Sequence, residues 1–147
     1  MALRLRAARG LRLVANMANL STPAGLLIAL VGRARLRRGP GGLILAEGFR
    51  GRWLTACAFT VGDVIVIPDR TLEEVQNDVP DVLVHEEQHS WQYTYCGGLF
   101  FLPLYLAACG WSLLCAGNPW ARNFFEVQAG LRAGGYLHDA DDGVGYD

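Results

Sequence analysis

The segment that most constrains the fold is Gly39-Pro40-Gly41-Gly42, because it separates two parts of the chain with different residue patterns. Proline and glycine together end helices and favour turns. Upstream of it, Ser21-Thr22-Pro23 is typical of a helix start, so we expect a helix from Pro23 to about Arg38. Downstream, the residues are of the β type as far as Pro68. This change of pattern favours an α+β fold.

Three runs that follow the break are rich in β-branched and aromatic residues. They are Leu43–Phe49 (LILAEGF), Trp53–Val61 (WLTACAFTV) and Asp63–Pro68 (DVIVIP). Two short turn-like segments, Arg50-Gly51 and Gly62-Asp63, separate these runs. Runs of this length joined by short turns predict a small antiparallel β-meander of three strands.

Helix signals dominate the rest of the chain. Thr71 to Glu74 matches a capping box, in which the two side chains bind each other's free backbone amides. A longer helix is expected from Val82 to about Tyr95, where Cys96-Gly97-Gly98 ends it. Asn118-Pro119 then opens another, from about Pro119 to Arg132. The expected order is an N-terminal helix, the small meander and two later helices.

The chain is long enough for one hydrophobic core, at 147 residues. We therefore divide it into a basic N-terminal segment, 1–42, with its helix and Gly/Pro linker, and a single domain, 43–147. Residues 1–46 hold eight arginines and no acid, whereas the rest holds five arginines and fourteen acids. Such a basic segment suits either an anionic membrane surface or a solvated arm. Without interleaved aromatic residues or a recognisable motif, it predicts no nucleic-acid partner.

Residues 99–116 contain no charged side chain, which raises the question of a membrane. Pro103, Gly110 and Ser112 interrupt this stretch, whose length barely reaches that of a membrane span. We expect a buried or membrane-dipping pair of helices in preference to a true span. The N-terminus makes a poor secretory signal, and the four cysteines form no CxxC pair. The expected location is cytoplasmic or membrane-associated, and not clearly secreted.

One five-residue string, His85-Glu86-Glu87-Gln88-His89, carries the chemistry as an HExxH motif in the helix expected from Val82. Helical residues four apart lie about 6 Å apart on one face, so two imidazoles can bind the same ion. His85 and His89 are therefore candidate ligands of one Zn²⁺ per chain, which can keep a coordination position open for water. Glu86 is the candidate general base that takes that water's proton.

A catalytic zinc usually has three protein ligands, and Glu126 is the candidate for the third. It lies among Phe124, Phe125 and Val127 on the helix expected from Pro119, and it is the only acid between Glu87 and Asp139. Two alternatives stay open. Glu126 can instead form a surface pair with Arg122, four residues earlier, and His138 can take its place as the ligand.

With these residues the sequence resembles the gluzincin type of HExxH zinc metallopeptidase, over roughly Leu43 to Ala133. It also resembles minimal bacterial HExxH proteins whose second helix carries an N-P-F-E-x-E-A-like string. Here Asn123, Phe125, Glu126 and Ala129 fit that string, while Phe124 replaces the proline and Gln128 the second glutamate. The resemblance implies a minimal zincin-like domain.

The resemblance also implies a function, namely a zinc-dependent peptidase or related amide hydrolase that acts on a peptide or protein substrate. In the family pattern an edge strand holds the substrate, and residues 64–67 are the candidate strand. A tyrosine or histidine stabilises the oxyanion, and the candidates are Tyr93, Tyr95, Tyr136 and His138. The alternative function is a non-catalytic, membrane-associated interaction module with a structural metal or none. A structural site would have a fourth protein ligand and would not need Glu86.

Overall fold

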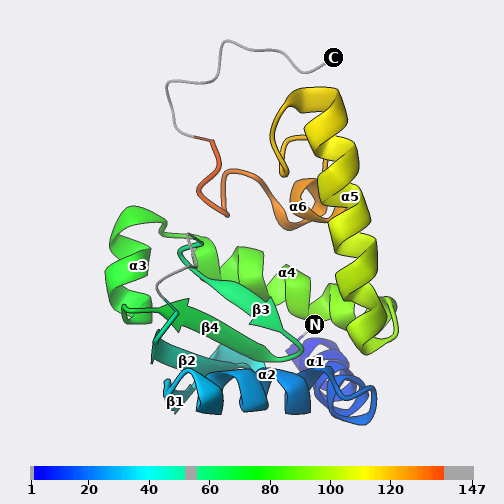
Figure 1. The fold of residues 1–147 in the computed structure, drawn as a ribbon. Coiled ribbons are helices and arrows are strands. Elements are labelled where there is room, and N and C mark those ends of the chain that lie inside the picture. The colour runs from blue at the N-terminus through cyan, green and yellow to red at the C-terminus, as the bar shows by residue number, and fades with distance from the viewer. Residues whose placement is uncertain (1, 52–55, 138–147) are drawn as a thin grey trace.

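The computed structural model describes residues 2–51 and 56–137 and has the predicted α+β class (Figure 1). Within these ranges, a four-stranded sheet lies between two groups of helices. In chain order the elements are α1 (Ala2–Ala18), α2 (Ser21–Val31), β1 (Arg35–Arg38), η1 (Pro40–Gly42), β2 (Ile44–Phe49), β3 (Phe59–Val61), β4 (Val64–Pro68), α3 (Leu72–Asp78), α4 (Val82–Tyr95), η2 (Gly98–Phe100), α5 (Phe101–Ala116) and α6 (Phe124–Ala129).

The sheet has the strand order β1-β2-β4-β3, so the predicted antiparallel meander is wrong. Strand β2 runs parallel to β4, while β1 pairs antiparallel with β2 and β3 pairs antiparallel with β4. After β2 the chain therefore crosses to the far edge, forms β3 and returns as β4 between its two neighbours. All five residues of β4 are buried, and a strand that is apolar on both faces is stable only in the interior of a sheet.

A tight turn at Gly62-Asp63 joins β3 to β4, as the sequence indicates. Gly62 has a φ of 64°, in the left-handed region that other residues rarely adopt. A Cβ atom at this position would lie 2.3 Å from the backbone nitrogen of Thr22, at the start of α2. Glycine thus allows both the turn and the close packing of α2 beneath it.

The helix predicted from Pro23 to Arg38 is too long. Helix α2 ends at Val31, and Arg35–Arg38 form the exposed edge strand β1 instead. Arg33 has a φ of 52°, which turns the chain out of the helix. The strand is held in register by β2, and the guanidinium of Arg37 lies 3.2 Å from the buried carboxylate of Glu47.

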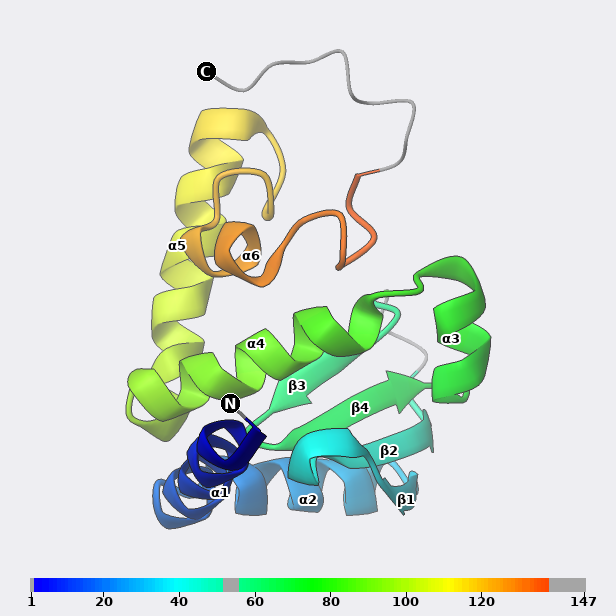
Figure 2. The ribbon, with the colours of Figure 1, turned by 180° about the vertical axis from the view of Figure 1, so that it is seen from behind.

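Both faces of the sheet are covered by helices (Figure 2). The side chains of β4 alternate, so Val64 and Val66 pack towards α2, whereas Ile65 and Ile67 pack towards α3 and α4. Helix α3 begins with the predicted capping box of Thr71 and Glu74, and α4 spans the residues that were predicted for it. The HExxH motif is therefore on a helix that one sheet face supports.

Segment 1–42 packs against the sheet and helix α4, and the buried side chain of Arg12 forms part of this contact. The guanidinium of Arg12, on α1, is fully buried and lies 2.8 Å from Asp63 in the β3–β4 turn. It also lies 2.9 Å from Glu87 on α4 and 5.2 Å from the centre of the Trp91 ring. Asp63 accepts further hydrogen bonds from Thr22 and Ser90. This ion pair connects α1, α2, α4 and the sheet.

Residues 99–116 form one helix where a pair was expected. Pro103 lies in the first turn of α5, where its missing N–H leaves no helix bond unmade, and Gly110 continues the helix. Together with η2, Gly98–Ala116 gives 19 helical residues, which contain an 18-residue window with a mean hydropathy of 1.9, and 11% of that window is buried. Helices α1 and α2 pass the same length and composition test only as one pair, bent by 71°.

The last predicted helix is shorter than expected. Helix α6 covers only Phe124–Ala129, since the Asn123 side chain caps it by accepting a hydrogen bond from the Phe125 amide. Gly130, with a φ of 97°, ends it. Figure 1 shows α5 rising from the end of α4, with α6 beside it and above α4. This arrangement directs Glu126 towards the HExxH helix.

Candidate metal centre

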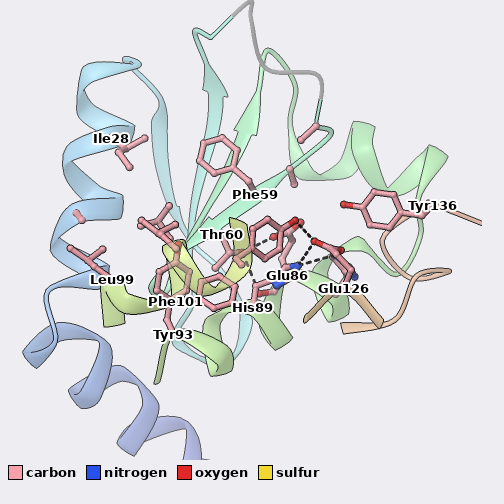
Figure 3. Close-up of a pocket in the computed structure, with 17 residues that line it drawn as sticks. Ile28, Phe59, Thr60, Glu86, His89, Tyr93, Leu99, Phe101, Glu126 and Tyr136 are labelled. Carbon is pink, nitrogen blue, oxygen red and sulfur yellow. Dashed lines mark hydrogen bonds and ion pairs between the residues drawn. The ribbon is translucent and has the colours of Figure 1, made fainter. Parts of the chain in front are cut away.

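Three side chains from two helices converge at one point (Figure 3). His85 and His89 are one turn apart on α4, and Glu126 reaches them from α6. The two Nε2 atoms lie 3.1 Å apart, and the Glu126 carboxylate oxygens lie 3.2 Å from His85 Nε2 and 3.5 Å from His89 Nε2. All three side chains are buried. Together they could hold a metal ion.

The Nδ1 atom of each imidazole, which points away from the cluster, is hydrogen-bonded to an oxygen that can only accept a hydrogen bond. His85 Nδ1 lies 3.1 Å from the Gly130 carbonyl, and His89 Nδ1 lies 2.8 Å from Oε1 of Gln92. Each Nδ1 must therefore carry the hydrogen, so a neutral ring presents the lone pair of Nε2 to the cluster. Gly134 closes the back of this arrangement, because a Cβ there would lie 2.7 Å from the His85 ring.

Gln92 is a functional candidate that the sequence reasoning missed. Its side-chain nitrogen donates to the Phe125 carbonyl and to Oε1 of Gln128, both at 2.9 Å. The backbone carbonyl can only accept, so the amide oxygen of Gln92 must face His89. Gln92 thus connects a histidine on α4 to α6. Its spacing, three residues after His89 and hence on the same side of the helix, was the available signal.

The two carboxylate oxygens of Glu126 have different surroundings. The Tyr105 hydroxyl, on α5, donates a hydrogen bond to Oε1 of Glu126. The other oxygen, Oε2, is buried and receives no hydrogen bond from the residues that the structure describes. Burial alone would raise the pKa of Glu126, but its interactions with His85 and His89 outweigh burial, and the pKa is lowered.

The pKa of His85 shifts in the direction opposite to that of Glu126. Burial alone would lower the pKa of His85, but its close contact with the Glu126 carboxylate and the negative charge of Glu86 outweigh burial, and the pKa is raised. Both shifts have one cause, which is the attraction between the Glu126 carboxylate and a positive charge on the neighbouring imidazole. A positive charge is therefore favoured between the three side chains.

Glu86 lies beside the cluster and points into the same cavity (Figure 3). Its carboxylate is buried, and Oε2 accepts a 2.6 Å hydrogen bond from the hydroxyl of Thr60 on β3. Thr60 fixes one carboxylate oxygen, which leaves Oε1 as the oxygen available to a substrate or to water. The sequence reasoning did not single out Thr60, because only the packing of β3 against α4 brings it near Glu86.

The cavity has a volume of about 510 Å³ and is mainly apolar. Besides the metal-binding cluster, Glu86, Thr60 and three tyrosines, its lining consists of aliphatic, alanine and phenylalanine side chains from α2, β3 and its preceding loop, η2 and α5. The predicted substrate strand, 64–67, is not an edge, because β4 pairs on both sides. The edge strand at the cavity is β3, whose residues Phe59, Thr60 and Val61 line it.

The tyrosine candidates differ in position. Tyr136 lines the cavity with its ring centre 5.9 Å from that of His85, and Tyr93 is buried in the cavity wall. Tyr95 is exposed and lies outside the lining, while His138 lies outside the described residues. Burial, followed by the charges of Glu126 and Glu86, raises the pKa of Tyr136. Its hydroxyl therefore stays protonated at neutral pH and can donate a hydrogen bond.

We compared the chain with known proteins. No family model matches it, and the comparisons with curated proteins and with solved structures found no match.

Proposed function

We propose that the chain is a zinc-dependent peptidase or related amide hydrolase with one zinc ion held by His85, His89 and Glu126. The observation that carries the proposal is the convergence of two imidazole lone pairs and a buried carboxylate, with separations of 3.1, 3.2 and 3.5 Å. Tetrahedral zinc with contacts of about 2.0–2.1 Å separates its ligand atoms by about 3.3 Å. The described side chains therefore fit zinc without rearrangement.

The reaction follows from the neighbours of this cluster. Bound zinc would supply a Lewis acid that polarises a carbonyl and makes a water molecule more acidic. Glu86 Oε1 takes a proton from the attacking water, whose oxygen bonds to the carbonyl carbon of the substrate. Glu86 then gives this proton to the leaving nitrogen as the C–N bond breaks. The Tyr136 hydroxyl is the best placed of the predicted tyrosines to donate to the developing oxyanion.

The alternative of a structural metal in a non-catalytic module has less support. A structural zinc site is usually closed by four protein ligands, whereas the described residues form a group of three. A buried glutamate directed into a cavity beside that group also has no purpose in a purely structural site. Both observations favour an open site for chemistry.

The zinc content of purified protein tests the metal centre. We expect about one zinc per chain after mild dialysis, and substantial loss of zinc in a Glu126→Ala variant, because the carboxylate is one of only three ligands. Elemental analysis measures this directly. Glu73→Ala, at an exposed position on α3, is the matched control and should keep its zinc. A parent protein that takes up no zinc after reconstitution would overturn the proposed function.

We also propose that α5 contacts a lipid bilayer. The helix is apolar on all sides, yet only 11% of the 18-residue apolar window within Gly98–Ala116 is buried, and no charged residue lies between His89 and Arg122. An apolar helix of this kind belongs either in a protein core or in a membrane, and a core helix would be buried. Of the four N-terminal arginines, Arg9 and Arg12 are engaged by Glu87 and Asp63, so the predicted basic cluster is only partly available to lipid.

Binding to phosphatidylcholine vesicles tests this contact. We expect the parent protein to co-sediment with uncharged vesicles, and a Leu106→Glu/Leu114→Glu variant to lose most of this binding, since both leucines are exposed on α5 (67% and 86%). The matched control is Leu11→Glu/Val14→Glu, at equally exposed positions on α1. Equal vesicle binding by the parent and the α5 variant would exclude α5 as the membrane contact.

A further inference from the structure

We infer that the cavity beside the metal centre selects a substrate segment with a large apolar side chain, and that this segment enters from the surface of α5. The inference rests on the proposed function and adds the class of substrate. The wall of the cavity is formed by α2, β3 and α5 around the HExxH helix.

The charges at the cavity wall argue against a substrate with an acidic or a basic side chain at this position. Among the described residues of the lining, only Glu86 and Glu126 are acidic, and they are engaged by Thr60 and by the histidines with Tyr105. No described cation lines the cavity, so an acidic side chain would be buried there without a partner. A basic side chain would leave its charge among Ile28, Phe59 and Phe101. An aliphatic or aromatic side chain is therefore the complementary occupant.

Two leucines that line the cavity indicate where a substrate enters it. Leu99 and Leu102 line the cavity and are also exposed, by 39% and 42%. The apolar wall thus continues onto the outer surface of α5, where Leu106 is exposed. On the opposite side β3 is the edge strand of the sheet that the described residues form, and its outer edge can pair with an extended chain. A substrate between the two would have its backbone along β3 and an apolar side chain towards α5.

Peptide binding to a Glu86→Gln variant tests this selection without requiring hydrolysis. We expect calorimetry to show that a peptide with a central leucine or phenylalanine binds at least about tenfold more tightly than the same peptide with glycine or aspartate. Leu102→Arg should reverse the order of leucine and aspartate by placing a cation in the wall. Leu106→Arg is the matched control, because Leu106 is on the same helix but outside the lining.

Two results would overturn the inference, and neither coincides with failure of the proposed function. Equal affinity for leucine and aspartate peptides would exclude an apolar selectivity pocket. An unchanged preference in Leu102→Arg would show that the side chain binds elsewhere. The proposed function is judged separately, by zinc content and by hydrolysis in the parent protein, so a zinc-loaded hydrolase without this preference would refute only the substrate class.

A second inference rests on the hydrogen bonds of Gln92, independently of the cavity. We propose that Gln92 is the positioning residue for the metal centre. Its side-chain oxygen accepts from His89 Nδ1, and its nitrogen donates to the Phe125 carbonyl, next to Glu126. One buried amide thus orients a ligand on α4 and attaches the helix that carries the third ligand. Groups that orient metal-binding histidines in this way typically change metal affinity by about 10- to 100-fold.

Three variants separate this role from mere packing. Gln92→Met, which has a similar volume and no hydrogen bonds, should bind zinc about 10- to 100-fold more weakly and shift the absorption spectrum of the Co²⁺-substituted protein. Gln92→Glu keeps the acceptor for His89 but loses the donor to the Phe125 carbonyl, so it should recover only part of the affinity. Gln128→Ala removes only an outer partner of Gln92 and should resemble the parent. Parent-like zinc affinity and Co²⁺ spectrum in a folded Gln92→Met protein would refute the proposal.

Discussion

Glu86→Gln should retain zinc and lose hydrolysis, with kcat/KM lower by about 10²- to 10⁴-fold. The substitution keeps the size of the side chain, and an amide oxygen can still accept the hydrogen bond from Thr60. It removes the carboxylate that takes the proton from water, while His85, His89 and Glu126 remain in place. Hydrolysis of a quenched fluorescent peptide, measured together with zinc content, gives both quantities for the same sample.

The exposed Glu73 supplies the control for this result, since Glu73→Gln changes the same chemical group far from the cavity. Its kcat/KM should equal that of the parent. Full activity in zinc-loaded Glu86→Gln would refute the assignment of Glu86 as the base. Loss of zinc in that variant would instead indicate that Glu86 contributes to the metal site itself, which its position beside the cluster does not predict.

Arg12→Met should destabilise the protein by about 3–5 kcal/mol, the usual cost of breaking a buried ion pair from one side. Arg12 and Asp63 are both fully buried, and methionine would leave the Asp63 carboxylate without its cation. Thr22 and Ser90 would still donate hydrogen bonds to it, but neither carries charge. Urea unfolding followed by circular dichroism measures the free energy of unfolding.

Arg9 offers a matched comparison within the same helix. It pairs with Glu87 at 3.0 Å, but its side chain is 34% exposed, so Arg9→Met should cost no more than about 1 kcal/mol. The difference between the two variants measures the combined effect of burial and of the additional partner Asp63. Equal free energies of unfolding for both would mean that Arg12 contributes no more than a surface pair.

The candidate site was largely predictable from sequence because its essential spacing is local. Four residues separate His85 from His89, and any regular helix with this spacing places both on one face. Helix α4 is defined by neighbouring residues, from the turn before Val82 to the glycines after Cys96, and it was predicted with its observed bounds. Glu126 stood out because a lone acid within an apolar run is costly to bury unless it has a partner.

The strand arrangement was not predictable by the same reasoning, because pairing between strands is not local. Two strands in sequence can pair directly or leave room for a third, and short turn-like segments do not distinguish these cases. The continuous burial of β4 was the available signal for an interior strand. Arg35–Arg38 shows the same limit, since these residues suit an exposed helix equally well and only pairing with β2 makes them a strand.

By itself the sequence determined the α+β class, the HExxH helix, the capping box of α3 and which acid is available to meet the two histidines. Each of these depends on spacing or chemistry within a few residues. Only the tertiary structure decided the strand order, the edge that faces the cavity, and the approach of Thr60, Gln92 and Tyr105 to the site. The hydrogen bonds of these three side chains join residues 21 to 33 positions apart, and they form only when the sheet and helices pack around one core.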